Sequence, residues 1–301
     1  MLTFDKLILC VQKDGYDKKD FEDAFSAPYE EGPGGHIRVA IADGATESSF
    51  SKEWANLLVN EYRYNSQFSL ENDTLLEDLM NRWERKVGGF NLPWFASEKR
   101  NIGAFAAFLG VDIDPVTGHW VATAIGDSCL FVVRNNQLLT SFPFSKQDEF
   151  NNSPHLISSK EKNNRNLKDW TRIASGNLMS GDLLIMATDA ISDWFLKEVT
   201  AQGQPWLFPE QLMDTDRKDR EKKKLLDIWL SVKNDWMEAN KIKKDEDTDY
   251  FTNLVFTNNG SSSDVERWMF TNWIFRRWLT GWRDSGHIKN DDTTLFLIKV
   301  K

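Results

Sequence analysis

Apolar positions along the chain change period several times, and each change predicts a different element. Residues 6–12 and 36–42 are apolar and rich in β-branched side chains, and the segment between them is rich in turn formers, which predicts two strands joined by a loop. Over residues 54–62 the apolar positions recur at three- and four-residue spacing, so a helix is predicted there. Residues 72–87 show the same spacing and predict a second helix.

The middle of the chain has the pattern of short strands separated by tight turns. Even spacing of this kind predicts an antiparallel meander and not alternating strands and helices. The predicted strands cover residues 102–114, 119–127, 129–135 and 137–142.

The last third of the chain adds two strands and two helices to the prediction. Residues 181–190 are almost continuously apolar, which indicates a strand buried on both faces, and residues 293–300 form a final run of β-formers. Helical patterns cover the highly charged segment 214–248 and the tryptophan-rich segment 264–279.

Composition and charge narrow the classes of function. A chain of 301 residues with 41% hydrophobic residues has enough apolar side chains to bury a sizeable core. The formal net charge of −9 argues against a nucleic-acid-binding protein, which needs a basic face. Cys10 and Cys129 form no disulfide framework, so a cytoplasmic location is expected. No segment reaches the roughly 20 apolar residues that a membrane span requires, and no membrane association is expected.

Aspartates stand at the ends of the strand-like runs. Taken singly, each has an ordinary explanation, because aspartate caps helices and fills turns. Together they suggest more, since strand ends on one side of a sheet converge and several carboxylates there repel one another unless a cation lies between them. Hard oxygen ligands of this kind favour Mg²⁺ or Mn²⁺. The residues are Asp43, Asp127, Asp189 and the pair Asp291 and Asp292.

Other catalytic arrangements find less support in the sequence. The four histidines are scattered without paired spacing and the cysteines are isolated, which disfavours zinc. No glycine-flanked serine suggests a nucleophile, so covalent catalysis is the weaker hypothesis. A two-cation site instead activates water and holds both oxygens of an in-line displacement at phosphorus.

Five segments of the chain, taken in order, form a recognisable series. They are FEDAF (21–25), IADGATE (41–47), AIGDSCLFVV (124–133), DLLIMATDAISDW (182–194) and NDDTTLFLI (290–298). In this order they resemble the motifs of the metal-dependent type 2C serine/threonine protein phosphatases. The resemblance implies an α+β fold, a four-layer α-β-β-α sandwich with two central antiparallel sheets. It covers nearly all of a single domain, residues 1–301, and leaves a variable helical insertion at about residues 200–262.

The same resemblance implies a set of ligands for two cations, with a third in several relatives. Asp43 would bridge two Mg²⁺ or Mn²⁺ ions, and the main-chain carbonyl of Gly44 would bind the second. Asp189 and Asp291 would complete the first ion, and Asp127 would join Asp189 at the weaker third position. A hydroxide bridging the cations would then attack phosphorus without a phosphoenzyme.

Around these ligands the resemblance implies supporting residues, and the sequence departs from the family pattern at three places. Asp23 would hold cation-bound waters, and Lys18 stands where the family has an arginine that grips the substrate phosphate. Lysine supplies charge but no bidentate fork. Ala190 replaces the usual glycine after Asp189, and Asp292 replaces the usual asparagine of the last motif.

The leading hypothesis is therefore a Mg²⁺- or Mn²⁺-dependent phosphatase that acts on phosphoserine or phosphothreonine in a protein substrate. One alternative is a non-catalytic regulatory module that binds a partner protein through its tryptophan-rich insertion and the helix at 264–283, although tryptophan at helical spacing is more often core. Another alternative keeps the hydrolysis but acts on small phosphate esters.

Overall fold

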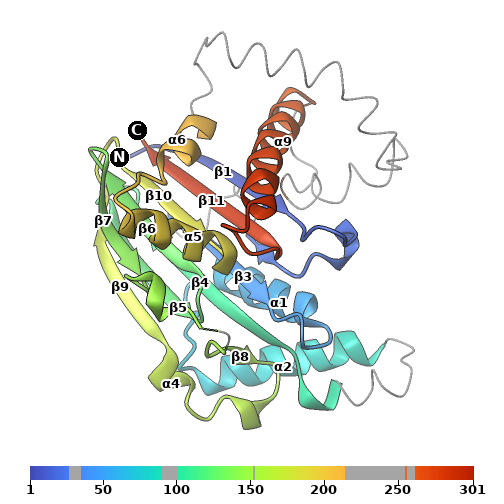
Figure 1. Cartoon of the computed structure of the whole chain (residues 1–301). Helices are drawn as coiled ribbons and strands as arrows, with labels where there is room; N and C mark the ends of the chain where they lie inside the picture. Colours follow the sequence, from blue (N-terminus) through green and yellow to red (C-terminus); the bar gives the residue numbers. More distant parts are fainter. Residues whose placement is uncertain (27–34, 90–99, 152, 214–254, 256–261) are drawn as a thin grey trace.

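Two antiparallel sheets lie face to face at the centre of the molecule, with helices on both outer faces (Figure 1). The computed structural model describes residues 1–26, 35–89, 100–151, 153–213, 255 and 262–301. The layers follow the order α-β-β-α, which confirms the predicted α+β sandwich.

The first sheet joins strands from both ends of the chain. The first and last strands of the chain, β1 and β11, pair antiparallel along their full length, with Ile8 opposite Phe296. The strand order is β1 (Phe4–Val11), β11 (Thr293–Val300), β10 (Leu183–Ala187), β6 (Cys129–Arg134) and β7 (Gln137–Phe142).

The second sheet is formed mainly by the first half of the chain. In it β3 and β4 pair along eight positions, which set Asp43 opposite Ala107. The order is β2 (Ala24–Phe25), β3 (Ile37–Gly44), β4 (Phe105–Ile113), β5 (His119–Ile125) and β9 (Arg172–Asn177), with the short β8 (Ile157–Ser158) paired to β4.

The four predicted central strands are all present, but they do not form one meander. The strands β4 and β5 belong to the second sheet, whereas β6 and β7 belong to the first. Gly126 begins the crossing at a φ of +97°, and a Cβ there would lie 2.5 Å from the Cβ of Ala107. The tight turn predicted after β5 therefore carries the chain from one sheet to the other, which a local turn signal does not specify.

Helices cover both outer faces. Asn72 caps α2 by accepting a hydrogen bond from the Leu75 amide. Phe50 occupies the cap position of α1 with a φ of 65°, and its side chain makes no capping hydrogen bond. The helices are α1 (Ser51–Tyr64), α2 (Asp73–Gly88), α4 (Leu167–Trp170), α5 (Asp189–Thr200), α6 (Leu207–Met213) and α9 (Ser262–Asp284), with 3₁₀ turns at Lys18–Asp20, Gln147–Glu149 and Glu161–Asn163.

Burial on both faces explains the continuous apolar run of β10. Leu184 and Met186 point into the core between the sheets, and Leu183 and Ile185 pack under the outer helices. In β11 the same alternation places Phe296 in the core between the sheets and Leu297 under the outer helices. Both faces of the first sheet are therefore covered, as the sequence pattern predicts.

The tryptophans of α9 pack against the rest of the protein. Trp268 is buried in the core between the sheets and donates from Nε1 to the Ile8 carbonyl at 2.7 Å. Trp278 and Trp282 pack against Trp194, which belongs to α5. A partner surface formed by these helices remains a prediction, and the helix predicted at 214–248 lies outside the described residues.

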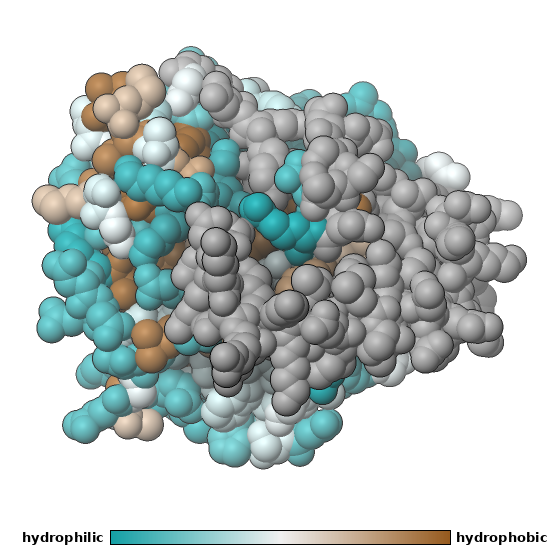
Figure 2. Space-filling model, turned by 90° about the horizontal axis from the view of Figure 1, so that it is seen from above, coloured by the Kyte–Doolittle hydropathy of each residue, from teal (hydrophilic) through white to brown (hydrophobic). Residues whose placement is uncertain are grey.

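The described surface shows no sign of a bilayer-spanning element. None of the helices in the described part of the chain combines the length and the apolarity needed to cross a membrane. On the coloured part of the face seen in Figure 2, hydrophilic side chains lie among the exposed hydrophobic groups. Cys10 and Cys129 are buried and free, which agrees with the absence of a disulfide framework.

Candidate active site

A pocket of about 830 Å³ opens where strand ends of both sheets meet. Every residue that the family resemblance assigns to a cation lines this pocket, and these residues come from four separate parts of the chain. These residues are Asp43, Gly44, Asp127, Asp189 and Asp291. The fold thus brings together side chains that the sequence places up to 248 positions apart, counted from residue 43 to residue 291.

Asp43 and Gly44 are the last two residues of β3. A Cβ at Gly44 would lie 2.7 Å from the main-chain oxygen of Glu22 and 3.0 Å from the Cβ of Ser51. Only glycine therefore lets β3 approach the segment that carries Asp23 this closely. Within the described residues, the structure gives the Asp43 carboxylate no hydrogen bond and no ion pair.

Asp189 and Asp291 are fixed by backbone groups next to them in sequence. Asp189 begins α5, and its Oδ1 accepts from the Ala190 amide at 2.6 Å. Asp291 stands just before β11, and its Oδ1 accepts from the Asp292 amide at 3.0 Å. In both carboxylates one oxygen is held and the other, Oδ2, points away from the backbone donor.

Asp23 lies beneath the pocket and is not among the described residues that line it. Its Oδ2 accepts hydrogen bonds from the hydroxyls of Thr294 at 2.7 Å and Thr188 at 3.1 Å. Its Oδ1 is buried and has no hydrogen-bond partner among the described residues. A buried, unsatisfied acceptor of this kind costs free energy unless a further donor, such as ordered water, reaches it.

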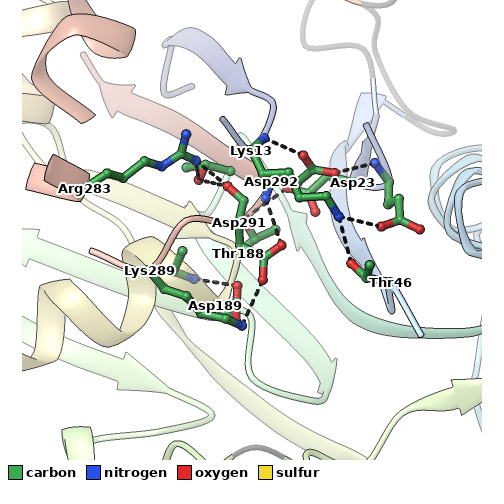
Figure 3. Close-up of polar contacts among 12 residues, drawn as sticks. Lys13, Asp23, Thr46, Thr188, Asp189, Arg283, Lys289, Asp291 and Asp292 are labelled. Atoms are coloured by element: carbon green, nitrogen blue, oxygen red, sulfur yellow. Dashed lines mark hydrogen bonds and ion pairs between the residues drawn. The ribbon is translucent and has the colours of Figure 1, made fainter. Parts of the chain in front are cut away.

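Asp292, which stands where the family has asparagine, joins the site to the segment between β1 and β2. Its Oδ1 accepts from the Lys13 amide at 2.8 Å and its Oδ2 from the Glu22 amide at 2.7 Å (Figure 3). An asparagine has a single acceptor oxygen and serves only one of these amides. This departure from the family pattern therefore has a structural role.

Lys13 is a pocket residue that the sequence patterns did not single out. Its Nζ lies 3.2 Å from Glu22 Oε2 and 3.1 Å from Thr46 Oγ1, and 4.6 Å from the centre of the Tyr16 ring. Burial acts to lower the pKa of Lys13, but the hydrogen bond and charge of Glu22 raise it overall. Lys18, the predicted phosphate-binding lysine, is not among the described residues lining the pocket.

Lys289 and Arg283 are two more residues near the predicted ligands that the sequence patterns did not identify. Lys289 Nζ lies 3.1 Å from Asp189 Oδ2 and 2.8 Å from Asp291 Oδ2, so one ammonium joins two predicted ligands (Figure 3). Arg283 is buried and donates to the main-chain oxygen of Asp291 and to Thr293 Oγ1. The only sequence signal for Lys289 is its place two positions before Asp291.

The carboxylates raise one another's pKa. Burial is the main cause for both Asp23 and Asp43, whose pKa values lie well above the ordinary value, and the neighbouring carboxylates add to it. Burial, and then the charge of Asp189, raise the pKa of Asp127 to about 7. Burial also raises the pKa of Asp189. The site thus concentrates negative charge in a setting that disfavours it.

The donor set fits a hard divalent cation. Carboxylate and main-chain oxygens are the ligands that Mg²⁺ and Mn²⁺ prefer, and the unsatisfied Oδ1 of Asp23 adds an acceptor below the pocket for an ion's water. In the described ranges, no group of three or more aspartate, glutamate, histidine or cysteine side chains is arranged closely enough to hold a metal ion as it stands. The residues needed are therefore assembled around one pocket, with Lys289 between two of them.

Comparison with protein families decides the family. The model of a family described as protein phosphatase 2C matches residues 16–231. The chain belongs to the protein phosphatase 2C family. This match includes the first four motif segments and ends before the fifth, which contains Asp291. That Asp291 lies in the same pocket of this phosphatase 2C chain is therefore seen from the structure alone. The comparison with curated proteins gives no match.

Solved structures of other phosphatases resemble the chain distantly. The phosphatase domain of SpoIIE from Bacillus subtilis is 14% identical with a TM-score of 0.38, and the alignment covers 100% of this chain and 93% of that one. The S. agalactiae serine/threonine phosphatase is 12% identical with a TM-score of 0.46, covering 99% and 100%. The catalytic domain of PstP in complex with two manganese ions is 11% identical with a TM-score of 0.48, covering 100% and 99%. The assignment to the phosphatase 2C family rests on the sequence match.

Proposed function

We propose that this member of the protein phosphatase 2C family is a Mg²⁺- or Mn²⁺-dependent phosphatase that hydrolyses phosphoserine and phosphothreonine in protein substrates. The observation that carries the proposal is the single pocket that gathers Asp43, Gly44, Asp127, Asp189 and Asp291. Family membership supports the same reaction class.

Each residue has a defined part in this reaction. Divalent cations, when bound, supply positive charge that activates water and stabilises developing charge on the phosphoryl oxygens. Asp43 would hold both cations, Asp189 and Asp291 the first, and Asp127 a third. Asp23 would accept a hydrogen bond from a water below the pocket, because its Oδ1 has no donor among the described residues.

Lys13 is the residue that we assign to the substrate phosphate. Its ammonium lines the pocket and is held by Glu22 and Thr46, so its position is fixed before substrate arrives. Lys18 was predicted for this contact from its motif position. Tyr16 and Ile102 line the same pocket with 54% and 58% exposure, which suits contact with the peptide around a phosphorylated residue.

The test is Mn²⁺-dependent release of phosphate from phosphoserine and phosphothreonine peptides. Asp43→Asn is expected to abolish it, because that carboxylate is assigned to both cations. Asp148→Asn, which removes an exposed carboxylate outside the pocket, is the matched control and is expected to stay active. Absence of release by metal-loaded wild-type protein from any phosphopeptide would refute the proposal.

Two added measurements separate the alternatives. Comparing rates on phosphopeptides with rates on an aryl phosphate distinguishes a protein phosphatase from an enzyme of small esters. Calorimetry with Mn²⁺ separates both from a non-catalytic module, which is expected to bind little or none.

A further inference from the structure

We propose that Lys289 sets the cation affinity of this site by holding the Asp189–Asp291 pair with its own ammonium until a divalent cation displaces it. The inference rests on the proposed function, because it concerns the same two carboxylates. It adds a determinant that the predicted ligand set does not contain.

The geometry around Lys289 is that of an exchangeable cation. Asp189 and Asp291 each have one oxygen tied to a neighbouring amide and present the other to Lys289 Nζ, at 3.1 and 2.8 Å. Those are distances for an ammonium, whereas Mg²⁺ requires ligands at about 2.0–2.1 Å. The oxygens that a cation needs are therefore the ones that the ammonium holds.

Exposure decides which partner can leave. The side chain of Lys289 is 63% exposed, while those of Asp189 and Asp291 are 17% and 25% exposed. A lysine side chain is a flexible four-carbon chain that ends in a strongly hydrated ammonium, so Lys289 can rotate into solvent. The carboxylates stay in place because their backbone contacts hold them.

Charge balance explains why such a lysine is useful. Asp43 and Asp127 line the same pocket as Asp189 and Asp291, so four carboxylates repel one another there. The Lys289 ammonium offsets part of their repulsion. Its displacement by a doubly charged ion then costs the site one ion pair at each of two carboxylates, which weakens the apparent affinity for that ion.

The size of the effect follows from the population of the open pair. When a binding-competent state is populated only one-tenth of the time, apparent affinity falls about tenfold. Replacing Lys289 by an uncharged residue removes this competition. We therefore expect Lys289→Met and Lys289→Gln to bind the first Mn²⁺ about tenfold more tightly than wild type.

The experiment is calorimetric titration of metal-free protein with Mn²⁺, with no substrate present. The matched control is Lys301→Met, because the Lys301 side chain is 61% exposed and pairs with Asp5 at 2.5 Å outside the pocket. Lys301→Met changes the net charge of the protein by the same amount as Lys289→Met, but away from the pocket. Lys289→Arg keeps the positive charge and is expected to bind Mn²⁺ no more tightly than wild type.

Tighter binding by both uncharged variants, with Lys301→Met unchanged, is the expected result. Equal or weaker binding by Lys289→Met and Lys289→Gln overturns the role of Lys289 and leaves the proposed phosphatase intact. Absence of Mn²⁺ binding by every protein in the series overturns both. A second readout is the thermal midpoint of metal-free protein, which is expected to fall in both uncharged variants as the carboxylates lose their counter-charge.

Discussion

The raised pKa of Asp127 predicts that this residue destabilises the metal-free protein at neutral pH. Asp127 is 7% exposed, and burial together with Asp189 raises its pKa from 3.8 to about 7. The ionised carboxylate is therefore disfavoured in the folded state relative to the unfolded chain. Asp127→Asn keeps the size of the side chain and removes the charge.

The magnitude follows from the shift. A difference of about 3 units at about 1.36 kcal/mol per unit gives an upper limit of about 4 kcal/mol. Below about pH 3 the carboxyl is protonated in both states, and the variant gains nothing. As pH rises from about 4 to about 7 the unfolded chain releases its proton first, so wild type loses stability; above about pH 7 the loss is complete.

The assay is urea unfolding of Asp127→Asn and wild type in excess chelator at several pH values. The variant is expected to be more stable at pH 8 and nearly equal to wild type at pH 4, where the unfolded chain has only begun to release the proton. Saturating Mn²⁺ is expected to narrow the difference, because a cation that binds only folded protein stabilises the ionised wild type. An advantage that is absent at pH 8, or that is the same at pH 4 and pH 8, would show that the reasoning is wrong.

Two further substitutions test the geometry of the pocket. Gly44→Ala places a Cβ 2.7 Å from the Glu22 carbonyl and is expected to cost about 1–3 kcal/mol in thermal unfolding, while Gly281→Ala, with nothing within 4 Å, is the control expected to cost nothing; equal midpoints would contradict the close approach. Lys13→Met is expected to raise KM for phosphopeptides and to weaken inhibition by inorganic phosphate about tenfold, with rescue by Lys13→Arg. If Lys18→Met produces that effect and Lys13→Met does not, the phosphate contact belongs to Lys18.

Much of the fold was predictable because burial leaves a period in the sequence. The continuous apolar run at 181–190 indicated a strand covered on both sides, and the structure shows Leu183 and Leu184 in different cores. The tight turn after β5 was also predicted. Its change of sheet was not, because a turn signal describes four residues and not the sheet that the next strand joins.

The candidate site divides in the same way. Its aspartates were found because each lies at or next to the end of a strand, where a carboxylate breaks an apolar run. Lys13 and Lys289 were missed because most lysines in a sequence belong to the surface and no period marks these two. Their importance depends on which chain segments meet, and that is set by pairing between β1 and β11.

The pairing of β1 with β11 also orders the folding of the molecule. Among the described strands β1 has β11 as its partner, so a strand made at residues 4–11 waits until residues 293–300 are available. Pairings so distant in sequence close large loops and form slowly. Asp291 enters the pocket with this last strand. The repulsion that Asp291 adds to Asp43 and Asp127 is therefore felt only once this strand is in place.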